Sequence, residues 1–326
     1  MRVHAVTVTY GNRFHLLKQV IDAALAEGVE KVIVVDNNSV DESRNKLKEY
    51  EKELNYKIKV LYLDDNYGSA GGFKRGLEEA YADSECEYII CLDDDNLIPK
   101  GTFLKIESIY YFLSMQSTNL MLGLNRPDWT ADQESACSGR IKKYYENNFK
   151  GFNFLRSVKR KILSRKLEKN NRFFPLQPAD ISAMGGLFFH KEILSKIGYP
   201  NEEFVVYADD HDFTYRFTSS GGHLLMCNSI LVKDLDSTTI SDKGEKIGHF
   251  DKDFSEFKLF YGIRNHTFLS KKFITNKFYF YMNMNLFLIW QARYIFKTSP
   301  SLFFKRYTLY LKAIKDGLNN NLGKTF

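Results

Sequence analysis

The stretch VHAVTVTYGNRFHLLKQVIDAALAEGVEKVIVVDNNS, residues 3–39, decides the fold class. It opens with an apolar run rich in β-branched residues, Val3–Thr9, which predicts a buried strand. Residues 14–27 carry apolar side chains at helical spacing, and Gly28 is typical of a helix end. The run KVIVV, residues 31–35, predicts a second strand. This order predicts two parallel strands joined by a right-handed crossover helix.

The strand–helix unit recurs up to residue 96. We expect helices over 42–54 (capped by Asp41) and 70–81, and strands over 57–63 and 88–92. A polar cluster follows each predicted strand, and the four clusters are Thr9–Arg13, Asp36–Ser39, Asn66–Gly72 and Asp93–Asn96. The carboxyl ends of parallel strands share one edge of the sheet, where α/β proteins bind ligands. We therefore predict an α/β fold with a mostly parallel sheet and a ligand site at that edge.

Length and composition exclude several classes of protein. The 326 residues, 44% hydrophobic and 26% charged, exclude a disordered chain and a disulfide-stapled mini-protein. The four cysteines are scattered, so we expect buried, reduced thiols and a reducing compartment. The start of the chain has no signal-peptide pattern, and the aromatic stretch 278–292 is too short and too polar to span a bilayer. Neither GxGxxG after the first strand nor GxxxxGK[ST] occurs, so no dinucleotide fold or P-loop is indicated.

Charge is distributed unevenly along the chain. Residues 139–172 hold twelve Lys or Arg and two acidic residues, and residues 257–315 hold eleven Lys or Arg and no acid. The second segment also contains 17 aromatic residues. A basic and aromatic segment is typical of a membrane-surface element. A core helical layer, a nucleic-acid-binding surface and a subunit interface are the alternatives. We favour an anionic membrane surface and do not expect nucleic acid as a partner.

The triplet Asp93-Asp94-Asp95 follows a predicted buried strand. Adjacent carboxylates repel one another, and sharing a hard divalent cation relieves the repulsion. Alternate side chains of a turn can point to one side, which makes Asp93 and Asp95 the expected metal ligands and turns Asp94 toward the ribose of a nucleotide. A solvated acidic turn is the alternative.

A second acidic cluster, YADDHDF, covers residues 207–213. One of its carboxylates can take the proton of an acceptor hydroxyl, and another can cap a helix. We expect both roles here, shared by Asp209 and Asp210. His211 is more typical of a hydrogen-bonding neighbour than of a catalyst.

The motifs TYGNR, VVDNNS, NYGSAGGFKRG, LDDDN, GGLFF, ADDHDFTYR and YGIRN occur in this order over roughly residues 3–265. Together they resemble glycosyltransferase family 2, which implies a GT-A fold and inverting sugar transfer. The combination of the glycine-rich motif, DDD and YGIRN is similar to bacterial galactofuranosyl- and rhamnosyltransferases. UDP-galactofuranose is therefore the first expected donor, and dTDP-rhamnose the second.

The resemblance also implies roles for individual residues. Asp36 would receive the imide N–H of uracil or thymine, and Gly185-Gly186 would shape the acceptor cleft. The residues implied to line the nucleotide pocket are Thr9, Tyr10, Arg13, Asp36, Asn66, Gly71, Gly72 and Asp94.

For the chemistry, the resemblance implies that Asp93 and Asp95 hold Mn²⁺ or Mg²⁺. Asp210 matches the general base, with Asp209 beside it. Relatives often supply a third metal ligand, a His, after the base, and Asp234 stands at that place here. Three possibilities stay open: Asp234 binds the metal, His249 does so, or two carboxylates and the diphosphate suffice.

We thus expect a catalytic GT-A domain over residues 1–233, with a basic insertion at about 139–172, and a helical region over 234–326. The expected partners are a nucleotide sugar, a lipid-linked or growing cell-surface glycan and an anionic membrane surface, and a homo-oligomer stays open. The expected location is the cytoplasm, at the inner face of the cell membrane. A nucleotidyltransferase and a basic binding protein without transferase activity are the rival hypotheses.

Overall fold

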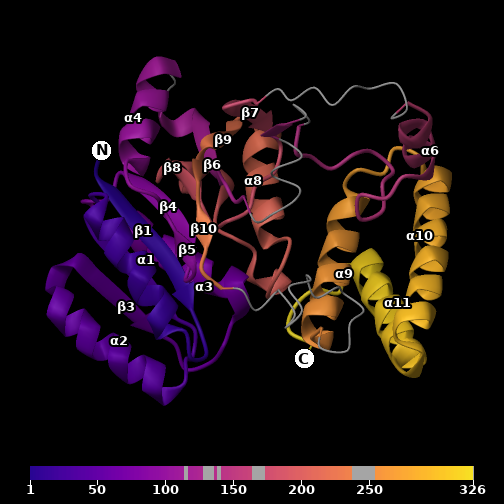
Figure 1. Cartoon of the computed structure of the whole chain (residues 1–326), viewed down its shortest axis with the longest axis horizontal. Helices are drawn as coiled ribbons and strands as arrows, with labels where there is room; N and C mark the ends of the chain where they lie inside the picture. Colours follow the sequence, from indigo (N-terminus) through magenta and orange to yellow (C-terminus); the bar gives the residue numbers. More distant parts are fainter. Residues whose placement is uncertain (114–116, 128–135, 138–140, 164–172, 237–253, 326) are drawn as a thin grey trace. The chain divides into compact units, whose positions relative to one another are not determined.

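The computed structural model describes residues 1–113, 117–127, 136–137, 141–163, 173–236 and 254–325. The chain divides into two compact units (Figure 1). The first, here called the sheet unit, comprises Met1–Lys142, Asn171–Glu202 and Asp210–Ser237. The second, the helical unit, comprises Lys143–Asn170, Glu203–Asp209 and Thr238–Phe326.

The sheet unit is built on an eight-stranded sheet with the order β3-β2-β1-β4-β8-β6-β9-β7. The strands are β1 (Val3–Thr9), β2 (Lys31–Asp36), β3 (Ile58–Tyr62), β4 (Tyr88–Asp93), β6 (Leu120–Asn125), β7 (Leu176–Ala179), β8 (Leu187–His190) and β9 (His223–Leu231). Within this sheet, β7 and β8 run antiparallel to their neighbours. The remaining pairs are parallel, so the predicted mostly parallel sheet is confirmed.

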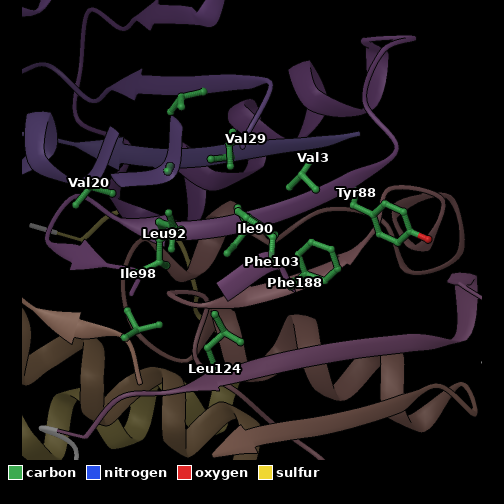
Figure 2. Close-up of a cluster of buried hydrophobic side chains, with 14 of the residues drawn as sticks. Val3, Val20, Val29, Tyr88, Ile90, Leu92, Ile98, Phe103, Leu124 and Phe188 are labelled. Carbon is green, nitrogen blue, oxygen red and sulfur yellow. The ribbon is translucent and has the colours of Figure 1, made fainter. Parts of the chain in front are cut away.

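The sheet is covered on both faces, which explains why its first four strands are nearly continuous apolar runs. One face packs against α1 (Phe14–Ala26), α2 (Asp41–Leu54) and α4 (Thr102–Leu113). The other face packs against α3 (Gly68–Ala82), α7 (Ile193–Ile197) and α8 (Asp209–Ser219). Figure 2 shows the first of these cores, where Ile90 and Leu92 of β4 lie among side chains from helices and neighbouring strands.

Helix α3 lies very close to β1, and two glycines make this approach possible. A Cβ added at Gly72 would lie 2.5 Å from Val8 Cγ1, and one at Gly76 would lie 2.5 Å from Val6 Cγ1. The sequence predicted a helix over 70–81. The helix begins two residues earlier, at Gly68, and both Gly71 and Gly72 are buried within it.

The helical unit contains α6 (Phe154–Leu163), α9 (Glu256–Lys271), α10 (Lys277–Thr298) and α11 (Phe303–Asn319). Helices α9 and α11 touch closely at Gly317, where a Cβ would lie 2.4 Å from the carbonyl oxygen of Arg264. Part of the basic segment 139–172 belongs to this core: Phe149 is fully buried against Phe280 and Phe287 of α10.

The described chain also contains short elements. They are β5 (Asn96–Leu97), β10 (Lys233–Asp234) and the 3₁₀ turns η1 (Asn55–Lys57), η2 (Ser117–Asn119), η3 (Glu202–Phe204) and η4 (Pro300–Leu302).

Three cysteines are buried as expected, but Cys137 is exposed. Asp41 lies inside α2, whose N-cap position is Val40. Among the described helices, we find none with the length and hydropathy that crossing a bilayer requires.

Candidate active site

Backbone pairing brings the predicted polar clusters to one edge of the sheet. The register places Thr9 of β1 opposite Asp36 of β2, and Val8 opposite Asp93 of β4. After Asp93 the chain turns into β5, which pairs antiparallel with β10 in a register that sets Asn96 opposite Asp234. Strand ends that are far apart in the sequence therefore meet at this edge.

Asp234 joins the Asp93–Asp95 triplet through Asn96 and the backbone. Asn96 Nδ2 donates to Asp234 Oδ1 at 2.9 Å, and the Leu235 amide donates to the carbonyl of Asp95 at 2.8 Å. The structure thus brings together the three side chains predicted to bind metal, Asp93, Asp95 and Asp234.

Arg13, which follows β1, binds one end of this acidic cluster. Its Nε lies 2.9 Å from Asp94 Oδ1, its Nη2 lies 3.0 Å from Asp95 Oδ2, and its Nη1 pairs with Asp236. Thr9 Oγ1 donates to Asp94 Oδ2 at 2.8 Å. The predicted nucleotide-pocket residues Thr9, Arg13 and Asp94 therefore form one connected group, with Asp94 almost fully buried.

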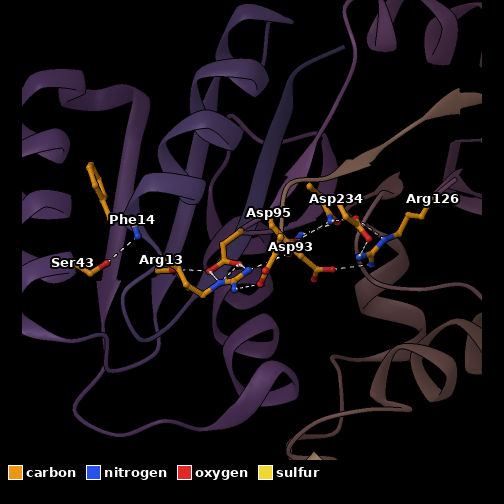
Figure 3. A network of polar contacts seen from close by, with 11 residues as sticks. Arg13, Phe14, Ser43, Asp93, Asp95, Arg126 and Asp234 are labelled. Carbon is orange, nitrogen blue, oxygen red and sulfur yellow. Dashed lines mark hydrogen bonds and ion pairs between the residues drawn. The ribbon is translucent and has the colours of Figure 1, made fainter. Parts of the chain in front are cut away.

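Arg126, which follows β6, binds the other end. Its Nη1 lies 2.9 Å from Asp93 Oδ2. Its Nε and Nη2 donate to the two oxygens of Asp234 at 3.1 and 2.9 Å, the two-point geometry that favours arginine over lysine. Figure 3 shows Asp93, Asp95 and Asp234 between the guanidinium groups of Arg13 and Arg126.

Negative charge exceeds positive charge in this cluster, which holds the carboxylates Asp93, Asp94, Asp95, Asp234 and Asp236 against two arginines. Burial, together with the charges of Asp93 and Asp94, raises the pKa of Asp95 to about 7. Burial also raises the pKa of Asp93, although Arg126 opposes the shift. An oxygen-rich site with excess negative charge suits a hard divalent cation.

The two arginines pair with the carboxylates that the sequence predicted to bind a metal. Within the described ranges, no three His, Cys, Asp or Glu side chains are grouped as a metal site requires. Arg126 pairs with Asp93 and Asp234, and Arg13 pairs with Asp95. His249, the alternative third ligand, lies outside the described residues.

Gly185 lets the backbone pass directly over the acidic cluster. A Cβ at this position would lie 2.2 Å from Asn96 Oδ1 and 2.6 Å from Asp93 Oδ2. Any larger residue would therefore displace the Asp93 carboxylate. The predicted role of Gly185 and Gly186 in an acceptor cleft stays a prediction, while the need for a glycine at 185 is structural.

Asp36 has partners of its own at the end of β2. It is fully buried, its Oδ1 accepts the Ser39 amide at 3.0 Å, and its Oδ2 pairs with Arg44. These contacts hold the turn that follows β2. Its predicted contact with a nucleotide base stays a prediction.

Asn37 connects β2 to the loop before α3. Its Nδ2 donates to Asn66 Oδ1 at 3.0 Å and to the Gly68 carbonyl at 2.9 Å, and its Oδ1 accepts the Tyr67 amide. Asn66 is thereby fixed at the same edge of the sheet. Tyr10 is 47% exposed, and the Arg13 guanidinium lies 5.5 Å from its ring centre.

The second acidic cluster lies at the start of α8. Asp209 is buried and Asp210 is half-buried, and Asp210 Oδ1 accepts the His211 amide at 2.7 Å. The charge of Asp210 contributes to the raised pKa of Asp93, so these two side chains lie within electrostatic reach of each other. Asp212 instead pairs with Arg216 at 3.0 Å, which is a contact within the helix.

An unusual backbone precedes Asp209. Val205, Tyr207 and Ala208 have φ of 66°, 66° and 64°, in the left-handed region that non-glycine residues rarely adopt. The Val206 amide donates to the Phe204 carbonyl at 2.8 Å, which closes a strained three-residue turn around Val205. The sequence did not predict this conformation.

Sequence reasoning also missed Arg126, Asp236 and Asn37. A signal existed for Arg126, because a charged residue directly follows the buried run LMLGLN of β6. Asn37 stands in a polar cluster that was identified as a whole, and Asp236 lies two residues after Asp234.

Comparison with known proteins agrees with this geometry. Residues 5–108 match the family described as glycosyl transferase family 2. That segment of the chain is similar to glycosyltransferase family 2. A curated relative, the low-salt glycan biosynthesis hexosyltransferase Agl10 of Haloferax volcanii, is 23% identical over 209 residues. The matched region covers 62% of this chain and 58% of the relative, so the chain spans little more than half of that protein's length.

Solved structures show that this chain has the GT-A fold. The structure of GalNAc-T7 with UDP, GalNAc and Mn²⁺ matches with a TM-score of 0.56 and 13% identity, over 83% of this chain and 48% of that one. The mannosyltransferase PcManGT of Pyrobaculum calidifontis, with GDP-Man and Mn²⁺, matches with a TM-score of 0.55 and 12% identity, over 97% and 87%. At these identities the likeness concerns the fold, and the predicted α/β GT-A class is confirmed.

Proposed function

We propose that this protein transfers a sugar from a nucleotide sugar to a glycan hydroxyl, with inversion at the anomeric carbon. One observation carries the proposal: at one edge of a GT-A sheet, the Asp93–Asp95 triplet lies against Arg13 and Arg126 and within electrostatic reach of Asp210. A buried acidic cluster, arginines and a half-buried carboxylate are the groups that this reaction requires.

The donor is a nucleotide sugar, with UDP-galactofuranose first and dTDP-rhamnose second. The preference for UDP-galactofuranose over dTDP-rhamnose rests on the combined motifs NYGSAGGFKRG, LDDDN and YGIRN. The two solved neighbours contain UDP with GalNAc and GDP-Man, which supports a nucleotide-sugar donor without selecting one. Thr9, Tyr10, Arg13, Asn66 and Asp94 would line its pocket.

Asp93 and Asp95 would hold Mn²⁺ or Mg²⁺, because their oxygens form a hard donor set with excess negative charge. Asp234 would join them as a third ligand if Arg126 gave up its two hydrogen bonds. A bound divalent cation would neutralise the charge that develops on the departing nucleoside diphosphate.

Asp210 would act as the general base. It takes the proton of the acceptor hydroxyl while that oxygen attacks the anomeric carbon from the side opposite the diphosphate. Attack from that side inverts the configuration. Asp210 is the more accessible of the two neighbouring carboxylates, whereas Asp209 is almost fully buried and suits a role in holding the start of α8.

The acceptor is a lipid-linked or growing cell-surface glycan, reached at an anionic membrane surface on the cytoplasmic side. Helix α10 supports this, because Phe278, Ile289 and Phe296 are 72%, 58% and 66% exposed. Their spacings of 11 and 7 residues place them along one side of the helix. The exposed cations Arg293 and Lys297 lie next to this stripe.

Charge favours a membrane over a second copy as the partner of this stripe. Residues 257–315 contain no acidic residue, so two copies meeting face to face would bring cations against cations. An anionic lipid surface instead attracts Lys and Arg while the rings enter the headgroup layer.

A thermal-shift panel of nucleotide sugars with Mn²⁺ tests the proposed activity. A donor at 100 times its dissociation constant adds about 2.7 kcal/mol of stability. Incubating the best donor with glycan acceptors should then release a nucleoside diphosphate. Release of pyrophosphate would instead identify a nucleotidyltransferase, and stabilisation by no nucleotide sugar would contradict the proposal.

A further inference from the structure

The three left-handed residues before Asp209 are held by two side chains of α9. Arg264 and Asn265 are both fully buried in the helical unit. They lie some sixty residues away in the sequence, yet their donors reach four carbonyls of the segment Glu203–Tyr207. A backbone of this kind persists only where its surroundings fix it, so these contacts account for it.

Asn265 supplies the main contacts. Its Nδ2 donates to the carbonyls of Phe204, Val206 and Tyr207 at 2.8, 2.8 and 3.0 Å. Three carbonyls that converge on one amide group are typical of a tight, irregular turn. The amide therefore substitutes for the hydrogen bonds that this segment cannot make within a helix or a sheet.

Arg264 determines which way the Asn265 amide points. Its Nε donates to Asn265 Oδ1 at 2.8 Å, which leaves the Nδ2 hydrogens for the carbonyls. Its Nη2 donates to the Glu203 carbonyl at 3.1 Å, and its Nη1 donates to the Gly323 carbonyl at 2.6 Å. The guanidinium lies 4.6 Å from the Tyr261 ring centre, so Tyr261, Arg264 and Asn265 of the YGIRN motif form one unit.

We propose that Arg264 and Asn265 are positioning residues that fix the strained turn Phe204–Ala208 and thereby the start of α8, where Asp209 and Asp210 lie. The chain passes from Ala208 directly into these two residues, so the turn is covalently continuous with the first residues of α8. This inference rests on the proposed function, in which Asp210 is the base.

Two variants of buried asparagines test it. Asn265→Ala removes the carbonyl contacts. Asn283→Ala is the matched control: Asn283 is equally buried in the same unit and holds another loop, donating to the Asn147 carbonyl and accepting the Phe154 amide, both at 2.9 Å. If Asn265→Ala does not accumulate as folded protein, Asn265→Ser, which keeps one donor, takes its place.

Amide hydrogen exchange of residues 204–210 is the first measurement. We expect at least tenfold faster exchange in Asn265→Ala and no change in Asn283→Ala. The second is the affinity for UDP with Mn²⁺ and the turnover of the best donor in the panel. Asn265→Ala should keep the affinity within about twofold and lose at least tenfold in kcat, since correct placement of a general base contributes about 10²–10⁴-fold.

Each outcome decides something. Unchanged exchange in Asn265→Ala would overturn the positioning role, and so would faster exchange with normal kcat. A wild type that transfers no sugar would contradict the proposed function. In that case, faster amide hydrogen exchange of residues 204–210 in Asn265→Ala would still show that Asn265 holds the turn.

Discussion

At the scale of single residues, Asp210 carries the chemistry in this account. Asp210→Asn should keep UDP affinity and lose about 10²–10⁴-fold in turnover, because an amide cannot accept the proton of the acceptor. Initial rates of nucleoside diphosphate release measure this. The buried neighbour variant Asp209→Asn is the comparison, and near-normal turnover in Asp210→Asn with a large loss in Asp209→Asn would assign the base to Asp209.

Arg126 acts on the same cluster as a built-in cation. Arg126→Met should destabilise the fold by roughly 3 kcal/mol, because Asp93 and Asp234 lose their partner. Added Mn²⁺ should then raise the melting temperature more in this variant than in the wild type, since the cation replaces the missing positive charge.

The control is Arg216→Met, which breaks the ion pair with Asp212 within α8. It should also lower stability, but its response to Mn²⁺ should equal that of the wild type. Equal Mn²⁺ responses of Arg126→Met and the wild type would show that the cluster does not take a divalent cation.

At the scale of elements, β1 introduces a pH dependence through His4. This residue is fully buried, and burial lowers its pKa below 6.5, with Asp83 opposing the shift. The unfolded chain therefore binds a proton more readily than the folded one, so stability falls as the pH drops below about 6.5.

Replacing His4 by Leu should weaken this acid sensitivity. Urea unfolding at pH 7.5 and 5.5 measures it, and one lost titration changes the difference by at most about 1.4 kcal/mol per pH unit. The exposed His15→Gln serves as the control. A pH dependence that is the same in all three proteins would assign the acid sensitivity to other groups.

Helix α10 is the element that we expect at the membrane. Replacing Phe278, Ile289 and Phe296 together by Ser should abolish most co-sedimentation with anionic vesicles, because these apolar side chains supply the part of binding that salt does not screen. High salt should release only part of the wild type. The control replaces Tyr111 and Phe112 of α4, which are 89% and 82% exposed, by Ser.

Vesicles with and without anionic lipid distinguish the outcomes. Equal binding of the wild type to both would refute the role of charge. Equal loss of binding in the α10 and α4 variants would show that exposed apolar area in general, and not this helix, drives the association.

At the scale of the whole molecule, the sequence predicted the four strands up to residue 96 and the three helices between them, because their periodicity is local. It did not predict β6 to β9. β7 contains Pro178 and β8 runs antiparallel to its neighbours, so the strand–helix repeat of the first four strands does not continue through them.

In the candidate site, too, the sequence predicted what depends on neighbouring residues and missed what depends on contacts between distant ones. Asp93, Asp94, Asp95 and Asp210 were found because acidic clusters at strand and helix ends are visible in one stretch of sequence. Arg126 was missed because its partners depend on pairing across the sheet. The turn at Val205 was missed because a β-branched residue locally favours extended backbone, and the side chains that hold the turn, Arg264 and Asn265, lie far along the chain.

The central claim is that the acidic edge of the sheet binds a nucleotide sugar together with a divalent cation. Calorimetry with UDP, with and without Mn²⁺, tests it most directly in the wild type and in Asp95→Ala. We predict that the wild type binds UDP only with Mn²⁺, and that Asp95→Ala, still folded, loses this binding. Metal-dependent affinity that is unchanged in Asp95→Ala, or a wild type that does not bind UDP, would contradict it.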